Sequence, residues 1–180
     1  TVPLIRATSI RTLALLLSSI STFPPSDAQI FPQYIMKALN KVVEDSEVIV
    51  RVAFAESVAM LAETGKRFLE VSVAMKVYKV ISSESTAKDK DSPDNSGENT
   101  PKETPSTGPT IIENTYDKEL AALQLQVSKW FVSLTTSTIS TSSYPKRALL
   151  HDLSRLCAFF GHSYVQSLIL PQLITFLNSP

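Results

Sequence analysis

The chain has 180 residues, 43% of them hydrophobic, and its 17 basic and 17 acidic side chains give a formal net charge of zero. This is enough apolar material for one core of ordinary domain size, and without a basic excess the chain is not expected to bind nucleic acid. Its single cysteine and the lack of an N-x-S/T sequon are consistent with a reducing cytosol. Polar residues and prolines interrupt every long apolar stretch, so none reaches the roughly 18 residues of a membrane-spanning helix, and no direct membrane insertion is expected.

The first half of the chain predicts three helices. Residues 1–21 form the first, which ends at Phe23-Pro24-Pro25. Residues 30–43 form the second, with Pro32 near the start, where a missing N–H is harmless. After a short acidic turn, residues 47–81 form a long third helix, with Gly65 as the point where it would bend. The apolar stripe expected on the first helix consists of Leu13, Leu16, Leu17 and Ile20.

Residues 82–115 differ in composition from the rest of the chain. They contain no aromatic residue and are dominated by Ser, Thr, Pro, Asp, Glu and Lys. Such a segment buries too little apolar surface to offset the entropy of ordering, so we predict a disordered low-complexity linker. Ser92, Thr100 and Thr104 each precede a proline and are candidate sites of proline-directed phosphorylation.

The second half predicts three further helices at residues 116–134, 145–161 and 163–177. Thr115, Asp117 and Glu119 suit the N-terminus of the first of these. No segment shows sustained alternation of apolar and polar residues, so no sheet is expected. The stripe of residues 116–134 consists of Tyr116, Leu120, Leu123, Val127, Trp130 and Leu134.

The helices repeat. When the sequence is aligned with itself so that Arg51 matches Arg6, a shift of 45 residues, apolar positions of the first and third helices coincide. Placing Gly161 on Gly65 brings Arg147 onto Arg51. A step of this length is typical of HEAT units, in which two antiparallel helices bury their apolar faces by stacking on neighbours.

We therefore predict an all-α fold: an α-solenoid of HEAT-type antiparallel helix pairs with one long disordered insertion. Its domains are HEAT-type repeats at 1–81, the linker at 82–115 and HEAT-type repeats at 116–180, and the pattern suggests one solenoid that is a fragment of a longer protein. The residues expected in the core are Leu16, Phe54, Leu61, Leu123, Trp130, Leu153 and Cys157.

Few residues point to chemistry. Asp45 and Arg51 bracket the turn between paired helices, where a carboxylate can cap a helix and a guanidinium can bind carbonyls. Gly65, Arg147 and Gly161 are the other structural candidates, from their matching positions in the repeat. The remaining candidates are better explained by structure: Cys157 as a core thiol, His151 and His162 as surface histidines, and Glu56, Glu63 and Glu70 as a solvated face. No catalytic residue, metal or cofactor is expected.

Six segments resemble a specific family. They are residues 30–35 (IFPQYI), 49–56 (IVRVAFAE), 61–70 (LAETGKRFLE), 116–123 (YDKELAAL), 155–161 (RLCAFFG) and 174–178 (ITFLN). In this order they resemble the HEAT region of the protein-kinase-like regulatory subunits of class III phosphatidylinositol 3-kinase, of the vacuolar protein sorting type. Residues 136–143 depart from the family pattern, and Thr141 stands where Asp45 stands in the earlier unit.

The resemblance implies a non-catalytic scaffold segment. The family carries an N-terminal serine/threonine-kinase-like domain, a HEAT solenoid and a WD-repeat propeller, and it holds the lipid-kinase catalytic subunit and a Beclin-like subunit together for autophagy and endosomal sorting. It also implies a cytoplasmic location, peripheral to endosomal or autophagic membranes. Two alternatives stay open: a generic HEAT adaptor of transport or phosphatase type, and a spacer in an enzyme whose catalytic domain lies outside these residues.

Overall fold

In the computed structural model the described residues are 2–24, 27, 30–87, 109–136 and 142–178, with the side chains of 80–87 and 109–114 excepted. Every regular element in these residues is helical, which confirms the prediction of an all-α fold. The elements are α1 (Pro3–Ser19), the π-helical turn η2 (Phe31–Ile35), α2 (Met36–Val43), α3 (Val48–Ala87), α4 (Pro109–Thr136), α5 (Tyr144–His151), α6 (Leu153–Tyr164), the π-helical turn η4 (Val165–Ile169) and α7 (Leu170–Leu177).

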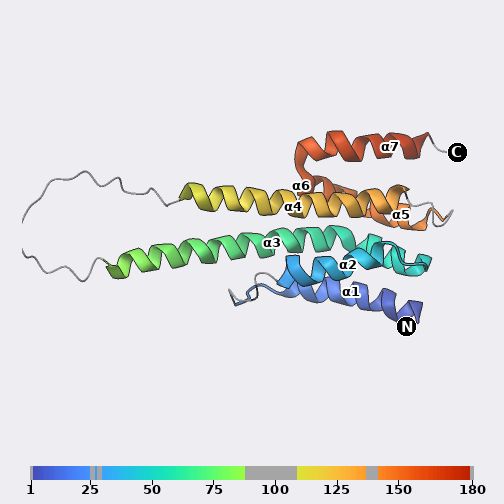
Figure 1. Ribbon diagram of the computed structural model, residues 1–180. Helices are drawn as coiled ribbons and strands as arrows, with labels where there is room; N and C mark the ends of the chain where they lie inside the picture. The colour runs from blue at the N-terminus through green and yellow to red at the C-terminus, as the bar shows by residue number, and fades with distance from the viewer. Residues whose placement is uncertain (1, 25–26, 28–29, 88–108, 137–141, 179–180) are drawn as a thin grey trace, which may run out of the picture.

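The helix α3 is the centre of the stack. α1 packs along one side of α3, α5 and α6 pack along another, and α4 along a third, while α2 contacts both α3 and α4. In Figure 1, α3 and α4 run antiparallel to one another and project together beyond the other helices, with α1 and α7 at opposite ends of the stack. α1, α3 and α5–α6 thus form one row, and α2 and α4 belong to a second row. This is the arrangement that stacked helix pairs produce.

The row formed by α1, α3 and α6 is joined by ion pairs between neighbouring helices. Arg11 of α1 donates to Glu56 of α3, at 2.8 Å from Nε to Oε2. Arg155 of α6 binds the carboxylate of Glu63, two turns further along α3. Glu56 and Glu63 are therefore exposed but paired, where the sequence had predicted an ordinary solvated face. Since Arg11 and Glu56 are 45 residues apart, the pair links consecutive units in the predicted register.

The core contains several of the side chains that the sequence placed there. Phe54, Leu61 and Trp130 are fully buried, and the ring of Trp130 meets Phe54 edge-on at a centroid distance of 5.2 Å. Leu123 and Leu153 are half-buried. Burying one such large side chain stabilises the fold by about 1.5–3 kcal/mol, and α3, which packs against α1, α4 and α5, contributes many of these side chains.

The buried face predicted for α1 was mostly wrong. Of the predicted stripe only Leu17 is buried, whereas Leu13 and Ile20 are 36% and 37% exposed. Leu16 is 60% exposed. The face of α1 that packs on α3 consists instead of Ala7, Ile10, Ala14 and Leu17. Two of these are alanines, which let the two helices approach closely, whereas Leu13, Leu15 and Leu16 face away from α3. Because residues 13, 15, 16 and 17 are all leucine, apolar periodicity alone could not identify the buried face.

The observed ends of α3 and α4 also correct the predicted bounds of the linker. α3 extends to Ala87 and α4 begins at Pro109, so both ends of the predicted linker, 82–115, are helical. Residues 82–87 contain neither proline nor glycine, and Pro109 occupies the first helical position, where proline is favoured. The predicted disorder and the phosphorylation candidates Ser92, Thr100 and Thr104 fall within 88–108, outside the described residues.

The single helix predicted at 145–161 is interrupted. Asp152 has φ −104° and ψ 27°, which separates α5 from α6. The break changes the register of the buried stripe, so Leu156 is buried and Cys157, expected in the core, is only half-buried. At the far end of α6, Gly161 has φ 75° and ψ 175°, a conformation essentially restricted to glycine.

Candidate interaction surface

The turn between α2 and α3 is held by a carboxylate and two guanidinium groups. Asp45 Oδ1 accepts the N–H of Glu47 at 3.0 Å, beside the start of α3. Its two oxygens also accept hydrogen bonds from Arg6 of α1, at 2.8 Å from Nη2 and 2.9 Å from Nε. The hydrogen bonds from Arg6 hold the pKa of Asp45 below its ordinary value, although partial burial opposes the shift, and the same pair raises the pKa of Arg6. This bidentate pair fixes α1 against the turn.

Arg51 stabilises the same turn by hydrogen bonds from its buried side chain. Its side chain is almost completely buried, at 2% exposure, and Nη1 donates to the carbonyl oxygens of Asp45 at 2.5 Å and Ser46 at 3.2 Å. A buried guanidinium needs such partners because an unpaired buried charge is strongly unfavourable. Since Arg51 is enclosed, the surroundings favour a structural role over a ligand site.

Arg147 does not repeat the environment of Arg51. It is exposed on α5 and makes no ion pair with any carboxylate that the structure describes. Thr141, which precedes it by six positions, lies outside the described residues. His151, also exposed, has Nδ1 3.6 Å from Oδ1 of Asp152. Neither Arg147 nor His151 lines the groove described below.

Gly65 lies where α3 meets both η2 and α4. α3 continues through this position and Gly65 has no positive φ, so its backbone conformation does not require glycine and a different constraint applies. A Cβ atom at residue 65 would lie 2.6 Å from Cε1 of Phe31 and 3.2 Å from Cδ1 of Leu123. The missing side chain therefore provides space for the ring of Phe31, which is 1% exposed.

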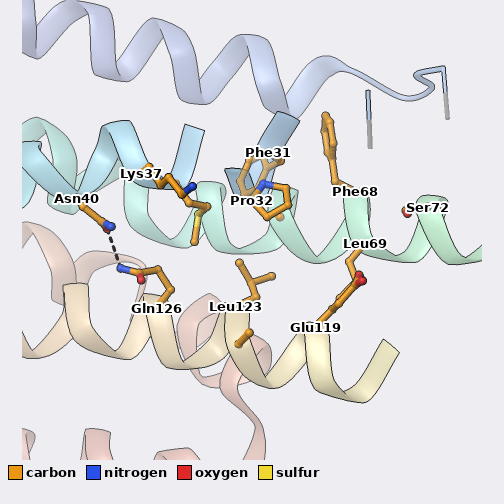
Figure 2. Close-up of a pocket in the computed structure, with 13 residues that line it drawn as sticks. Phe31, Pro32, Lys37, Asn40, Phe68, Leu69, Ser72, Glu119, Leu123 and Gln126 are labelled. Carbon is orange, nitrogen blue, oxygen red and sulfur yellow. Dashed lines mark hydrogen bonds between the residues drawn. The ribbon is translucent and has the colours of Figure 1, made fainter. Parts of the chain in front are cut away.

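Beside Gly65 there is a groove of about 460 Å³ between η2–α2, α3 and α4. Figure 2 shows Phe31 and Pro32 on one wall, Phe68 and Leu69 on α3, and Leu123 on α4. Phe31 and Phe68 are in contact, with ring centroids 5.4 Å apart, and Phe23 stacks on the other side of Phe68 at 4.4 Å. The groove is thus a mainly apolar depression with an aromatic base.

Polar contacts hold the two ends of the groove. At one end, Oδ1 of Asn40 accepts hydrogen bonds from Nε2 of Gln126 and Nε1 of Trp130, both at 2.7 Å, which ties α2 to α4 (Figure 2). At the other end, Nζ of Lys76 lies 3.8 Å from Oε1 of Glu119, which links α3 to α4. These contacts join the helices that form the walls of the groove.

Next to that second end, Tyr116 of α4 hydrogen-bonds to Glu70 of α3. Burial, followed by the negative charge of Glu70, raises the pKa of the Tyr116 hydroxyl above its ordinary value. The contact adds a further link between α3 and α4.

The groove contains no nucleophile paired with a base. Its lining residues include neither histidine nor cysteine, and its one carboxylate, Glu119, faces a lysine. Among the described residues no cluster of three His, Cys, Asp or Glu side chains could hold a metal ion. No helix in the described part of the chain is both long and apolar enough to span a membrane.

Comparison with known proteins gives the family. The family model described as "PIK3R4-like, middle domain" matches residues 1–180, the whole chain. The chain is a PIK3R4-like middle domain. It is 34% identical over 184 residues to the probable serine/threonine-protein kinase vps15 of Dictyostelium discoideum, and 31% identical over 175 residues to the serine/threonine-protein kinase VPS15 of Arabidopsis thaliana.

Both alignments cover 97% of this chain but only 8% and 11% of the two VPS15 relatives. The PIK3R4-like middle domain therefore spans about a tenth of their length, and it contains no kinase domain. The resemblance stated from the six sequence segments is confirmed at the level of this family. The sequence did not predict the groove, because it depends on how three separate helices meet. The one local signal is Gly65 within an otherwise good helix-forming stretch, with Phe68 one turn later.

Proposed function

We propose that this PIK3R4-like middle domain is a non-catalytic scaffold segment that supports assembly of a class III phosphatidylinositol 3-kinase complex. The observation that carries the proposal is the match of all 180 residues to the middle domain of a family whose resemblance implies this role. The partners in this proposal are the lipid-kinase catalytic subunit and a Beclin-like subunit. The complex would act in the cytoplasm, peripheral to endosomal or autophagic membranes.

The packing supports a role in fixing distances. Ion pairs and buried side chains join α1, α3 and α6 in one row, and Asn40 joins α2 to α4 in the other. In a stack of this kind each unit contacts only its neighbours, and a small rotation per unit accumulates along the stack. A local packing defect would therefore change the separation and orientation of whatever lies at the two ends.

Deleting the middle domain from a VPS15-like protein tests the proposal. Tagged full-length and deleted forms are expressed at equal levels, and the amounts of catalytic and Beclin-like subunits that co-purify are measured. We expect the deletion to lower both amounts strongly. Undiminished co-purification would contradict the proposal, and co-purification of transport or phosphatase components instead would favour the generic adaptor alternative.

A further inference from the structure

The groove between η2–α2, α3 and α4 has the length of about two helical turns. Its lining runs from Pro32 to Asn40 on one wall and from Glu119 to Gln126 on the other. At 1.5 Å per residue these walls are about 10–12 Å long. A space of about 460 Å³ with this length accommodates two or three side chains from one face of a helix.

The groove is preformed. Its base consists of buried side chains, among them Phe31, Met36 and Phe68, and Gly65 adds no side chain to fill it. The Asn40 hydrogen bonds fix one end, and the ion pair of Glu119 fixes the other. A preformed apolar depression binds an apolar side chain without first reorganising, which lowers the free-energy cost of association.

The lining of the groove has one positive and one negative residue, and only the negative one has an ion-pair partner among the described residues. Lys37 and Glu119 are its charged residues, and Glu119 already lies beside Lys76. Lys37 is exposed on the α2 wall, and no carboxylate in the described part of the chain lies within ion-pair distance of it. A ligand with a carboxylate next to its apolar side chains would complement this charge.

We propose that the groove is a docking site for an amphipathic helix of a partner protein. The helix would insert two apolar side chains, spaced three or four residues apart, between α2 and α4, and it would direct an Asp or Glu side chain toward Lys37. This is the ordinary way in which a helix occupies an apolar groove, with anchors on one face and charges at the rim. The inference rests on the proposed scaffold function and identifies which surface of the segment would be used.

Adjacent alanines on α4 provide a matched test. Ala121 and Ala122 are both exposed, but only Ala122 lines the groove. A small photoreactive diazirine residue is introduced at either position in a VPS15-like protein, the purified complex is irradiated, and the linked peptides are identified by mass spectrometry. We expect Ala122, but not Ala121, to become linked to a helix of another subunit that carries apolar residues one turn apart and an acidic residue beside them.

Charge-reversal substitutions on α2 provide a second test of the docking proposal. Lys37 and Lys41 are both exposed and one turn apart, but only Lys37 lines the groove. We expect Lys37→Glu to lower the yield of the Ala122 cross-link by about two- to fivefold, as expected for an exposed ion pair, whereas Lys41→Glu leaves it unchanged.

Three results would overturn the docking proposal: no link from Ala122 in an assembled complex, a link to the same chain or to a second copy of it, or equal effects of the two lysine substitutions. If the complex assembles normally and Ala122 remains unlinked, the groove inference fails while the scaffold function stands. If the catalytic and Beclin-like subunits do not co-purify at all, the scaffold function itself fails.

Discussion

Replacing Gly65 with alanine sets two effects of opposite sign against each other. In a solvent-exposed helix interior, Gly→Ala stabilises by about 1 kcal/mol, because alanine has the higher helix propensity. In this structure the new Cβ would lie 2.6 Å from Cε1 of Phe31, far inside the optimum of about 3.5–4.0 Å for two carbon atoms. The ring of Phe31 is buried against Phe68, so a shift of the ring away from the new methyl group would disturb that contact. Overpacking of this kind costs about 1–3 kcal/mol, so we expect Gly65→Ala to lower the free energy of unfolding by up to about 2 kcal/mol.

Urea unfolding of the 180-residue chain, followed by circular dichroism, measures this change. A double-mutant cycle with Phe31→Leu tests its cause, because a smaller side chain at residue 31 leaves space for the new methyl group. We expect a favourable coupling of at least about 0.5 kcal/mol between the two substitutions. A Gly65→Ala variant that is more stable than the wild type would refute the close-packing explanation.

Gly161→Ala is the matched control. A Cβ at this residue would meet no atom within 4 Å, but its φ of 75° and ψ of 175° strain any L-residue. We expect a loss of about 1–3 kcal/mol from the backbone alone. Because the cause is local to the backbone, the effect should add to that of Phe31→Leu with no coupling beyond about 0.5 kcal/mol.

Two further predictions concern the core and the turn before α3. Leu61→Ala should lower the free energy of unfolding, measured in urea, by about 2–5 kcal/mol, because Leu61 is fully buried. Leu15 is exposed, so Leu15→Ala should change the same free energy by less than about 0.5 kcal/mol. Equal effects of the two substitutions would contradict the described core. Asp45→Asn should cost about 1–3 kcal/mol at pH 7, because it weakens a charged pair with Arg6. Since the folded pKa of Asp45 is lowered, this stabilisation is complete above the unfolded pKa of about 3.9 and is lost as the pH falls through the folded value. A difference between wild type and Asp45→Asn that persists undiminished at pH 2 would contradict this account.

The sequence predicted the elements that depend on local signals. Pro32 lies near a helix start in the structure, as predicted, and apolar spacing correctly placed Phe54 and Trp130 in the core. It failed where the answer depends on a neighbouring helix. Leu16 is as apolar as the residues beside it, and only the position of α3 decides that it faces outward.

The glycines show the same limit. Gly65 and Gly161 occupy matching positions in the repeat, which made both of them structural candidates from the sequence. In the structure Gly161 is needed for its backbone conformation, and Gly65 for the space that it leaves to Phe31. The second requirement joins residues 34 positions apart on different helices, so no local pattern contains it. The groove, which depends on the same junction, was unpredictable for the same reason.

The central claim is that this segment acts by its packed shape and performs no chemistry of its own. The most direct test is a VPS15-like protein carrying Phe54→Asp, with Tyr78→Asp as an exposed aromatic control on the same helix. Assembly with the catalytic and Beclin-like subunits and the output of phosphatidylinositol 3-phosphate are measured together. We expect Phe54→Asp to lower both, because it places a charge in the core, and Tyr78→Asp to leave both near the wild-type level. If Phe54→Asp unfolds the segment and the complex still assembles with normal lipid-kinase activity, the account is wrong.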